Sequence, residues 1–112
     1  MEHDIDFKDG IITYENLFWL FNNTNELIYK LEFEEDLLQV QFFNEKYILD
    51  VGWYSTTGKN GKFKVYVIKN YDWGNPLFTK SNKKISGLIA TIKQGIKCIY
   101  SHEHLLINRS KS

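Results

Sequence analysis

Residues 47–77 restrict the fold more than any other part of the sequence, because their pattern predicts a long aromatic β-hairpin followed by a turn. Apolar side chains occupy every second position on both arms, as expected for strands with one buried face. These positions are Tyr47, Leu49, Val51 and Trp53 on the first arm, and Phe63, Val65 and Val67 on the second. Within the loop from Ser55 to Gly61, Asn60-Gly61 accepts the positive φ that a hairpin requires. The stretch therefore predicts two antiparallel strands that share an apolar face.

Similar patterns upstream predict further strands. Apolar and polar residues alternate over residues 29–33 and again over residues 38–42, and the acidic run Glu34-Glu35-Asp36 between them predicts a turn. The apolar run at residues 17–21 is short enough for a buried strand, although periodicity does not exclude a helix. Residues 1–13 are expected to contain a loop or a short edge strand. Short connections between these strands predict an antiparallel meander.

The apolar period lengthens after Pro76, which predicts a C-terminal helix that Ser81 or Asn82 could cap. Its apolar positions are Ile85, Leu88, Ile89, Ile92, Ile96 and Ile99. A short strand through Leu105–Ile107 is expected to follow. Because the apolar face of a helix can cover the apolar face of a sheet, we expect one α+β domain over residues 1–112, an antiparallel β-meander of about four to six strands with an amphipathic helix on one face.

The composition suits a small cytoplasmic protein. The 112 residues are 43% hydrophobic and 16% aromatic, which is enough for one core, and the single cysteine excludes an internal disulfide. The N-terminal Met-Glu-His-Asp-Ile-Asp lacks the basic and apolar pattern of a signal peptide. No apolar run approaches the ~20 residues that span a bilayer. We therefore expect a cytoplasmic location and no membrane contact.

The net charge of zero conceals two oppositely charged halves. Residues 1–50 contain 12 acidic and 3 basic residues, a net charge of −9, whereas residues 51–112 contain 2 acidic and 11 basic residues, a net charge of +9. Either the halves neutralise one another across the sheet, or the folded protein has an acidic and a basic side.

The phosphate-loop pattern is incomplete in this chain. Gly52–Lys59 (GWYSTTGK) has five residues between its glycines instead of four, Asn60 after the lysine, and a predicted strand where a phosphate loop needs a helix. Nucleotide hydrolysis is therefore not expected.

Other candidate chemical groups favour structural roles. Cys98, His102 and His104 could ligate zinc or pair as nucleophile and base, but a fourth ligand is not evident beside them. The preferred interpretation is a buried cysteine and two exposed histidines. Asp72 is expected to cap a turn and Asp50 to face the lysines across the hairpin. We expect a protein without enzymatic activity, metal or cofactor.

A basic and aromatic strand supports an alternative function. Residues 61–66, Gly-Lys-Phe-Lys-Val-Tyr, loosely resemble the aromatic strand of an RNA-recognition motif, where aromatic residues stack bases and lysines hold phosphates. That fold requires two helices between its strands, and one helix is predicted here. A small nucleic-acid-binding module that uses this Lys/aromatic strand face is the alternative hypothesis.

Three short motifs in order support a family resemblance. They are Asp50-Val51-Gly52-Trp53-Tyr54, Gly61-x-Phe63-x-Val65 and Asp72-Trp73-x-x-Pro76-Leu77, followed by the amphipathic helix. Over residues 47–98 this order resembles small bacterial immunity proteins of contact-dependent growth-inhibition systems. The resemblance implies a cytosolic protein that binds and blocks the toxic C-terminal domain of a secreted effector, often a nuclease. It transfers no catalytic residue.

An inhibitor of this kind needs a binding surface. Nuclease active sites are often basic, so an acidic patch could block one, and Tyr or Trp residues are common interface anchors. The candidate partner-binding residues are Glu34, Glu35, Asp36, Trp53, Tyr54, Asp72 and Trp73, with Tyr66 and Tyr71 as further aromatic candidates. A basic surface from Lys59, Lys62 and Lys64 that meets an acidic toxin face is the open alternative.

Overall fold

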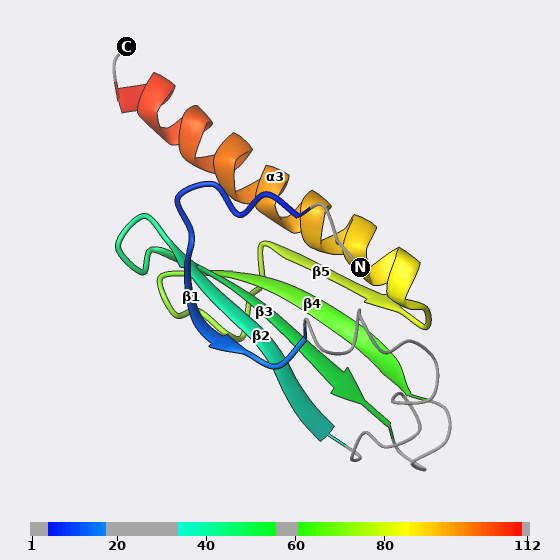
Figure 1. Cartoon of the computed structure of the whole chain (residues 1–112). Helices are drawn as coiled ribbons and strands as arrows, with labels where there is room; N and C mark the ends of the chain where they lie inside the picture. Colours follow the sequence, from blue (N-terminus) through cyan, green and yellow to red (C-terminus); the bar gives the residue numbers. More distant parts are fainter. Residues whose placement is uncertain (1–4, 18–33, 56–60, 111–112) are drawn as a thin grey trace.

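The computed structural model describes residues 5–17, 34–55 and 61–110, which form a five-stranded sheet and a long helix (Figure 1). The elements are β1 (Ile11–Glu15), β2 (Glu34–Phe42), β3 (Tyr47–Tyr54), β4 (Lys62–Lys69), β5 (Phe78–Asn82) and α3 (Ile85–Ser110). Neighbouring strands are antiparallel, and their order in the sheet is their order in the sequence. The predicted α+β meander with a C-terminal helix is confirmed.

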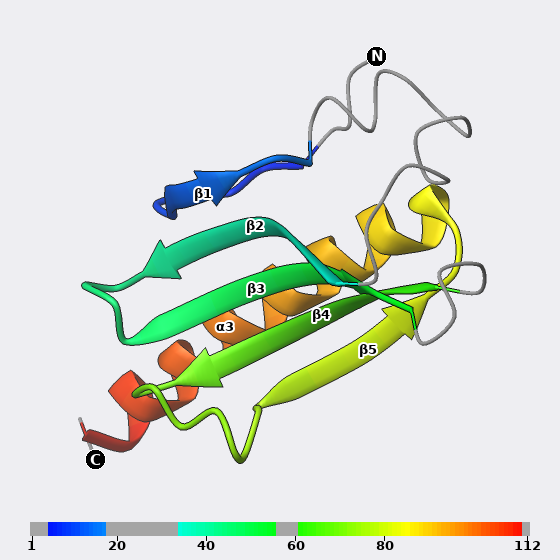
Figure 2. The same ribbon diagram turned by 90° about the horizontal axis from the view of Figure 1, so that it is seen from below.

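The alternation of apolar side chains sets the register of the sheet. Leu49 of β3 lies between Val40 of β2 and Val67 of β4, and Val51 lies opposite Val65. A slip of one residue would turn this row toward the other face, so its burial fixes the pairing. Figure 2 shows α3 on the opposite side of the strands from the viewer, so the helix covers one face of the sheet.

The helix contributes a stripe of aliphatic side chains to the core. Leu88, Ile92 and Ile99 are fully buried together with the apolar row of the sheet. Gly95 permits a close approach, because a Cβ at this position would stand 2.9 Å from Leu49 Cδ1. Two glycines lower the intrinsic helix propensity, so burial of the apolar stripe holds α3 in place. In the part of the chain described here, no helix has the length and apolarity needed to cross a membrane.

The sequence predictions for two short segments, one acidic and one apolar, are wrong. Glu34–Asp36 does not form a turn; it is the start of β2 and pairs with residues 52–54 of β3, because these backbones extend the antiparallel ladder. Leu105–Ile107 does not form a strand but continues α3. No Gly or Pro interrupts the sequence after Gly95, and side-chain bonds from His102 and Glu103 to Tyr47 hold this part of the helix.

The start of the helix also differs from the prediction. Ser81 and Asn82 belong to β5, a strand that the sequence patterns did not indicate, and the helix begins at Ile85. Lys84 therefore occupies the capping position, and its carbonyl accepts a hydrogen bond from Leu88 N–H at 3.0 Å. Asn82 instead donates to Thr91 Oγ1 at 2.6 Å.

The N-terminal predictions can be compared in part. The short edge strand is present as β1, although it begins at Ile11 and extends to Glu15. Leu17 is buried, but the rest of the run at residues 17–21 and the strand predicted at residues 29–33 lie outside the described residues.

Candidate protein-binding site

The residues predicted to contact a partner lie at two opposite ends of the sheet. Tyr54, at the end of β3, pairs with Glu34 and Lys62, whereas Tyr47, at the start of β3, pairs with Lys69. The eight residues of β3 separate these ends by roughly 25 Å. Glu34, Glu35, Asp36, Trp53 and Tyr54 lie at the first end, and Asp72 and Trp73 follow β4 at the second. The candidates therefore do not form a single patch.

Trp53 is a core residue and not a surface anchor. It is 5% exposed, and its ring packs edge-on against Phe63 with 4.9 Å between ring centres. Gly61 lies directly on the indole, with no room for a Cβ between them. Because Trp53 shares the face of β3 that α3 covers, it cannot reach a partner while the fold is intact.

Of the three acidic candidates at the same end of the sheet, the structure describes the side chain of one. Asp36 is exposed, while the side chains of Glu34 and Glu35 lie outside the described set. Tyr54 is partly buried, and the Lys64 ammonium lies 5.3 Å from the centre of its ring, which engages the aromatic face in a cation–π contact.

The Lys/aromatic face of β4 also carries carboxylates. Asp50 lies opposite Tyr66 and accepts a hydrogen bond from Gln39 Nε2 at 3.2 Å; the predicted pairing with a lysine is not the contact that it makes. Burial raises the pKa of Asp50 despite the opposing effect of the Gln39 hydrogen bond, and the nearby Asp36 raises it further. The face thus mixes both charges and lacks the uniform positive potential that favours nucleic acid.

The loop from Asn70 to Leu77, at the other end of the sheet, presents two large aromatic side chains. Tyr71 is 54% exposed and Trp73 is 49% exposed. Backbone bonds from Asp72 N–H to Lys69 O at 3.0 Å and from Leu77 N–H to Val67 O at 2.8 Å fix both ends of the loop. Asn75 Nδ2 lies 3.3 Å from each carboxylate oxygen of Asp72, so Asp72 has the turn-forming role predicted for it.

A second turn, Phe43–Lys46, supports this loop. Asn70 N–H donates to Lys46 O at 2.8 Å, which joins the two turns directly. Partial desolvation and the hydrogen bond with Glu45 raise the pKa of Tyr71 above its usual value. Phe43 is 36% exposed, and its ring centre lies 5.1 Å from that of Tyr100 on α3. The two turns and the helix therefore make one connected structure.

Backbone strain is concentrated in the same two turns. Among the described residues, six other than glycine have a positive φ, and five of them are here: Phe43, Asn44, Glu45, Asn70 and Tyr71. Asparagine tolerates this conformation, but for bulky residues such as Phe43 and Tyr71 it is unfavourable. Such strain persists where surrounding contacts enforce it and is frequent at functional sites.

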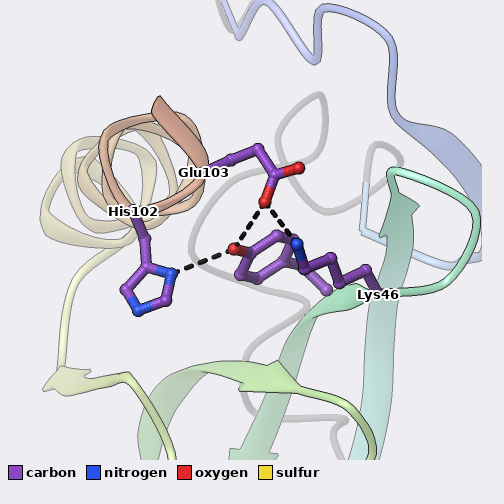
Figure 3. A network of polar contacts seen from close by, with 4 residues as sticks. Lys46, His102 and Glu103 are labelled. Atoms are coloured by element: carbon purple, nitrogen blue, oxygen red, sulfur yellow. Dashed lines mark hydrogen bonds and ion pairs between the residues drawn. The ribbon is translucent and has the colours of Figure 1, made fainter. Parts of the chain in front are cut away.

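A polar network fastens α3 to this end of the sheet (Figure 3). Lys46 Nζ lies 2.7 Å from Glu103 Oε1, and the Tyr47 hydroxyl donates to the same oxygen at 3.0 Å. His102 Nδ1 lies 3.0 Å from the Tyr47 oxygen. The single hydroxyl proton of Tyr47 is used in its hydrogen bond to Glu103. We therefore infer that His102 Nδ1 carries a proton and donates a hydrogen bond to the Tyr47 oxygen.

The network also shifts the ionisation of its members. The Lys46 hydrogen bond is the main effect that lowers the pKa of Glu103, with the Tyr47 bond acting in the same direction. Burial raises the pKa of Tyr47, and its bond to the Glu103 carboxylate adds to the increase. Glu103 is therefore a carboxylate and Tyr47 a neutral phenol at neutral pH, the states that the hydrogen bonds require.

The possible zinc ligands are not assembled into a metal site. His102 is bonded to Tyr47, and burial raises the pKa of the Cys98 thiol, which disfavours a reactive thiolate. Within the described ranges, no group of three or more His, Cys, Asp or Glu side chains is placed to hold a metal ion.

We use the name turn end for residues 43–46, 70–77 and 102–107, which lie at the same end of the molecule (Figures 1 and 2). Its exposed large apolar side chains are Phe43, Tyr71, Trp73, Leu77, Leu105 and Ile107, six of the nine in the described part of the chain. Sequence reasoning identified Trp73 and Tyr71 and missed the other four. For Phe43 and Leu77 the usable signal was an apolar residue at a turn position, where strand alternation does not bury it, whereas Leu105 and Ile107 lie on α3.

Comparisons of the chain with protein-family models, with curated proteins and with solved structures found no match. The functional argument therefore depends on the geometry of the turn end and on the sequence motifs.

Proposed function

We propose that this chain is an immunity protein, a stoichiometric inhibitor that binds a cognate toxin domain through the turn end. Binding blocks the active site of the toxin or the access of substrate to it. The partner in this proposal is the C-terminal domain of a bacterial effector, with nucleases as the first class to test. The complex forms in the cytoplasm, and the chain acts without catalysis, cofactor, membrane or nucleic acid.

The observation that carries this proposal is the exposure of Tyr71 and Trp73 on a loop held by its own hydrogen bonds. Tyr and Trp are enriched among the residues that dominate binding free energy. A loop that is ordered before binding loses little conformational entropy when the complex forms. Exposed anchors on a fixed loop are what a tight inhibitor requires.

The surroundings of these anchors suit a basic partner. Glu45 and Asp72 are exposed beside the aromatic side chains, whereas Lys46 is paired with Glu103. These two carboxylates beside exposed aromatic side chains would attract the positively charged cleft of a nuclease and speed association. This assigns to the turn end the blocking role that the sequence analysis expected of the acidic run Glu34–Asp36.

The proposal is tested by capture followed by neutralisation. The tagged protein and its Tyr71→Ala/Trp73→Ala variant are used to capture partners from a lysate of the source bacterium treated with nuclease. The captured protein is then expressed in a test bacterium with and without this chain. We expect a 1:1 complex with the wild type, little complex with the variant, and toxicity that the wild-type chain suppresses.

Two results would contradict the proposal. One is a captured protein whose expression is harmless, and the other is recovery of nucleic acid alone when nuclease treatment is omitted. The second result would favour the nucleic-acid-binding alternative. Lys62→Ala, an exposed position on β4 at the far end of the sheet, is the matched control and should capture the same partner as the wild type.

A further inference from the structure

A shallow groove of about 580 Å³ lies between α3 and the segment Asp6–Asp9. Ile96 and Tyr100 of the helix line it with apolar surface. The Asp9 N–H donates to the Tyr100 hydroxyl at 3.2 Å, and Lys8 Nζ lies 5.6 Å from the centre of the Tyr100 ring. These two contacts hold the segment against the helix and form the second wall of the groove.

The walls of the groove are strongly basic. Lys93 and Lys97 line it from α3 and Lys8 lines it from the segment, while Asp6 is the one carboxylate in the lining. Residues 73–102 contain five lysines and no acidic residue, so α3 has no carboxylate of its own over this length. In the parts of the chain described here, the one ion pair found is Lys46–Glu103, outside the groove. Like charges one helical turn apart repel, as Lys93 and Lys97 do, and an anionic ligand would relieve this repulsion.

The lining of the groove selects among anions. Besides the lysines, the lining offers apolar surface from Ile96 and from the partly exposed Tyr100. A phosphate backbone would pair with the lysines but would leave this apolar surface uncovered. A peptide that carries an apolar side chain between carboxylates matches both the apolar surface and the basic walls.

We propose that this groove binds an acidic segment of the toxin domain. An apolar side chain of the segment packs on Ile96 and Tyr100, and its flanking carboxylates pair with Lys8, Lys93 and Lys97. The identity of the partner rests on the proposed function, whereas the peptide chemistry rests on the groove alone. The contact between Tyr100 and Phe43 connects the groove to the turn end, so one partner can engage both.

The test measures binding of short synthetic probes to the full chain by NMR. The first probe is an eight-residue peptide of Asp and Glu with a central leucine, the second replaces the leucine with glycine, and the third is an oligothymidylate of equal length. We expect the leucine peptide to shift the amide signals of residues 6–9 and 93–104 at low salt. Because burial of the leucine side chain contributes to binding, the leucine peptide should bind about tenfold more tightly than the glycine peptide.

A matched pair of variants locates the binding. Lys93→Glu/Lys97→Glu should weaken binding of the leucine peptide at least about tenfold through charge reversal. Lys62→Glu/Lys83→Glu has the same change in net charge at exposed positions outside the groove lining and should bind like the wild type.

Three outcomes would overturn the inference: no binding of the leucine peptide, equal binding of the oligothymidylate, or equal affinity of the two double variants. None of them involves the captured toxin or the aromatic anchors. Failure here would therefore remove the groove and leave the turn-end proposal standing, and failure of the capture experiment would leave the peptide result intact.

Discussion

The two ends of the sheet each have a tryptophan, and the two residues serve opposite purposes. Trp53 lies in β3 on the face covered by α3, opposite Phe63, and is 5% exposed. Trp73 lies in a loop without a strand partner and is 49% exposed. Position in the strand ladder, and not residue type, decides which tryptophan stabilises the fold and which is available for recognition.

Replacement of the buried tryptophan should give the largest loss of stability and distinguish the two ends of the sheet. Trp53→Ala removes a large core side chain, and we expect it to lower the free energy of unfolding by about 3–5 kcal/mol. Trp73→Ala should change it by less than about 0.5 kcal/mol, because the side chain is half exposed. Urea denaturation followed by circular dichroism measures both values. Similar losses for the two variants would contradict the contrast.

The same contrast should be reversed for partner binding. Trp73→Ala is expected to weaken binding of the captured partner by about 2 kcal/mol, close to thirtyfold, as for an interface hot spot. Isothermal titration calorimetry measures this change, with Lys62→Ala as the control. Wild-type affinity in the Trp73 variant would show that the partner binds elsewhere.

Loss of the Tyr47 hydroxyl should weaken the attachment of α3 to the turn end while the aromatic ring of residue 47 stays in the core. Tyr47→Phe deletes the hydroxyl that bonds both Glu103 and His102, and we expect a loss of about 1–2 kcal/mol in stability. Tyr66→Phe, on the other face of the sheet, is the control and should have a smaller effect. The nitrogen chemical shifts of His102 would also change, because Nδ1 would lose its acceptor. An unchanged ring spectrum would contradict the hydrogen bond between His102 and Tyr47.

The pH dependence of stability should report on Glu103. Its pKa is lower in the folded protein than the ordinary value of 4.5, so its contribution is present above pH 4.5 and is lost as the pH falls through the lower folded pKa. Glu103→Gln should therefore cost less than about 1 kcal/mol at pH 7 and progressively less below pH 4.5. Denaturation curves from pH 7 to pH 3 measure this, and a difference that does not depend on pH would contradict it.

The smallest change in stability is expected for a variant of Asp50, which lies on the face of the sheet that α3 does not cover. The change should be opposite in sign to that of Glu103→Gln. Burial raises its pKa, so ionisation of Asp50 at neutral pH opposes folding and protonation at lower pH relieves this penalty. Asp50→Asn should be equal to or slightly more stable than the wild type at pH 7, by less than about 1 kcal/mol, since the amide can still accept from Gln39. Its advantage should shrink as the pH falls toward 4; an advantage that grows would contradict the assignment.

The period of the apolar residues predicted the arrangement of β2 to β4 and the path of α3, because burial of one face enforces both. It did not predict β5, where Thr79, Lys80 and Ser81 are exposed and lack alternation. It also missed the extension of α3, which depends on the contact between Tyr47 and Glu103, 56 positions apart in the sequence. For the same reason, the turn end could be predicted only in part: Trp73 is visible in a local motif, but the hydrogen bond from Asn70 that joins its loop to the Phe43–Lys46 turn is a tertiary contact.

Hydrogen exchange of the complex with the captured partner, measured by mass spectrometry, tests the central claim most directly. The account predicts that binding slows exchange in residues 43–46 and 70–77, where the exposed anchors and their supporting turn lie. Exchange in residues 34–36 and 53–54, at the other end of the sheet, should remain unchanged. Protection of residues 34–36 and 53–54 without protection of the turn end would contradict the account and return the binding surface to the acidic start of β2.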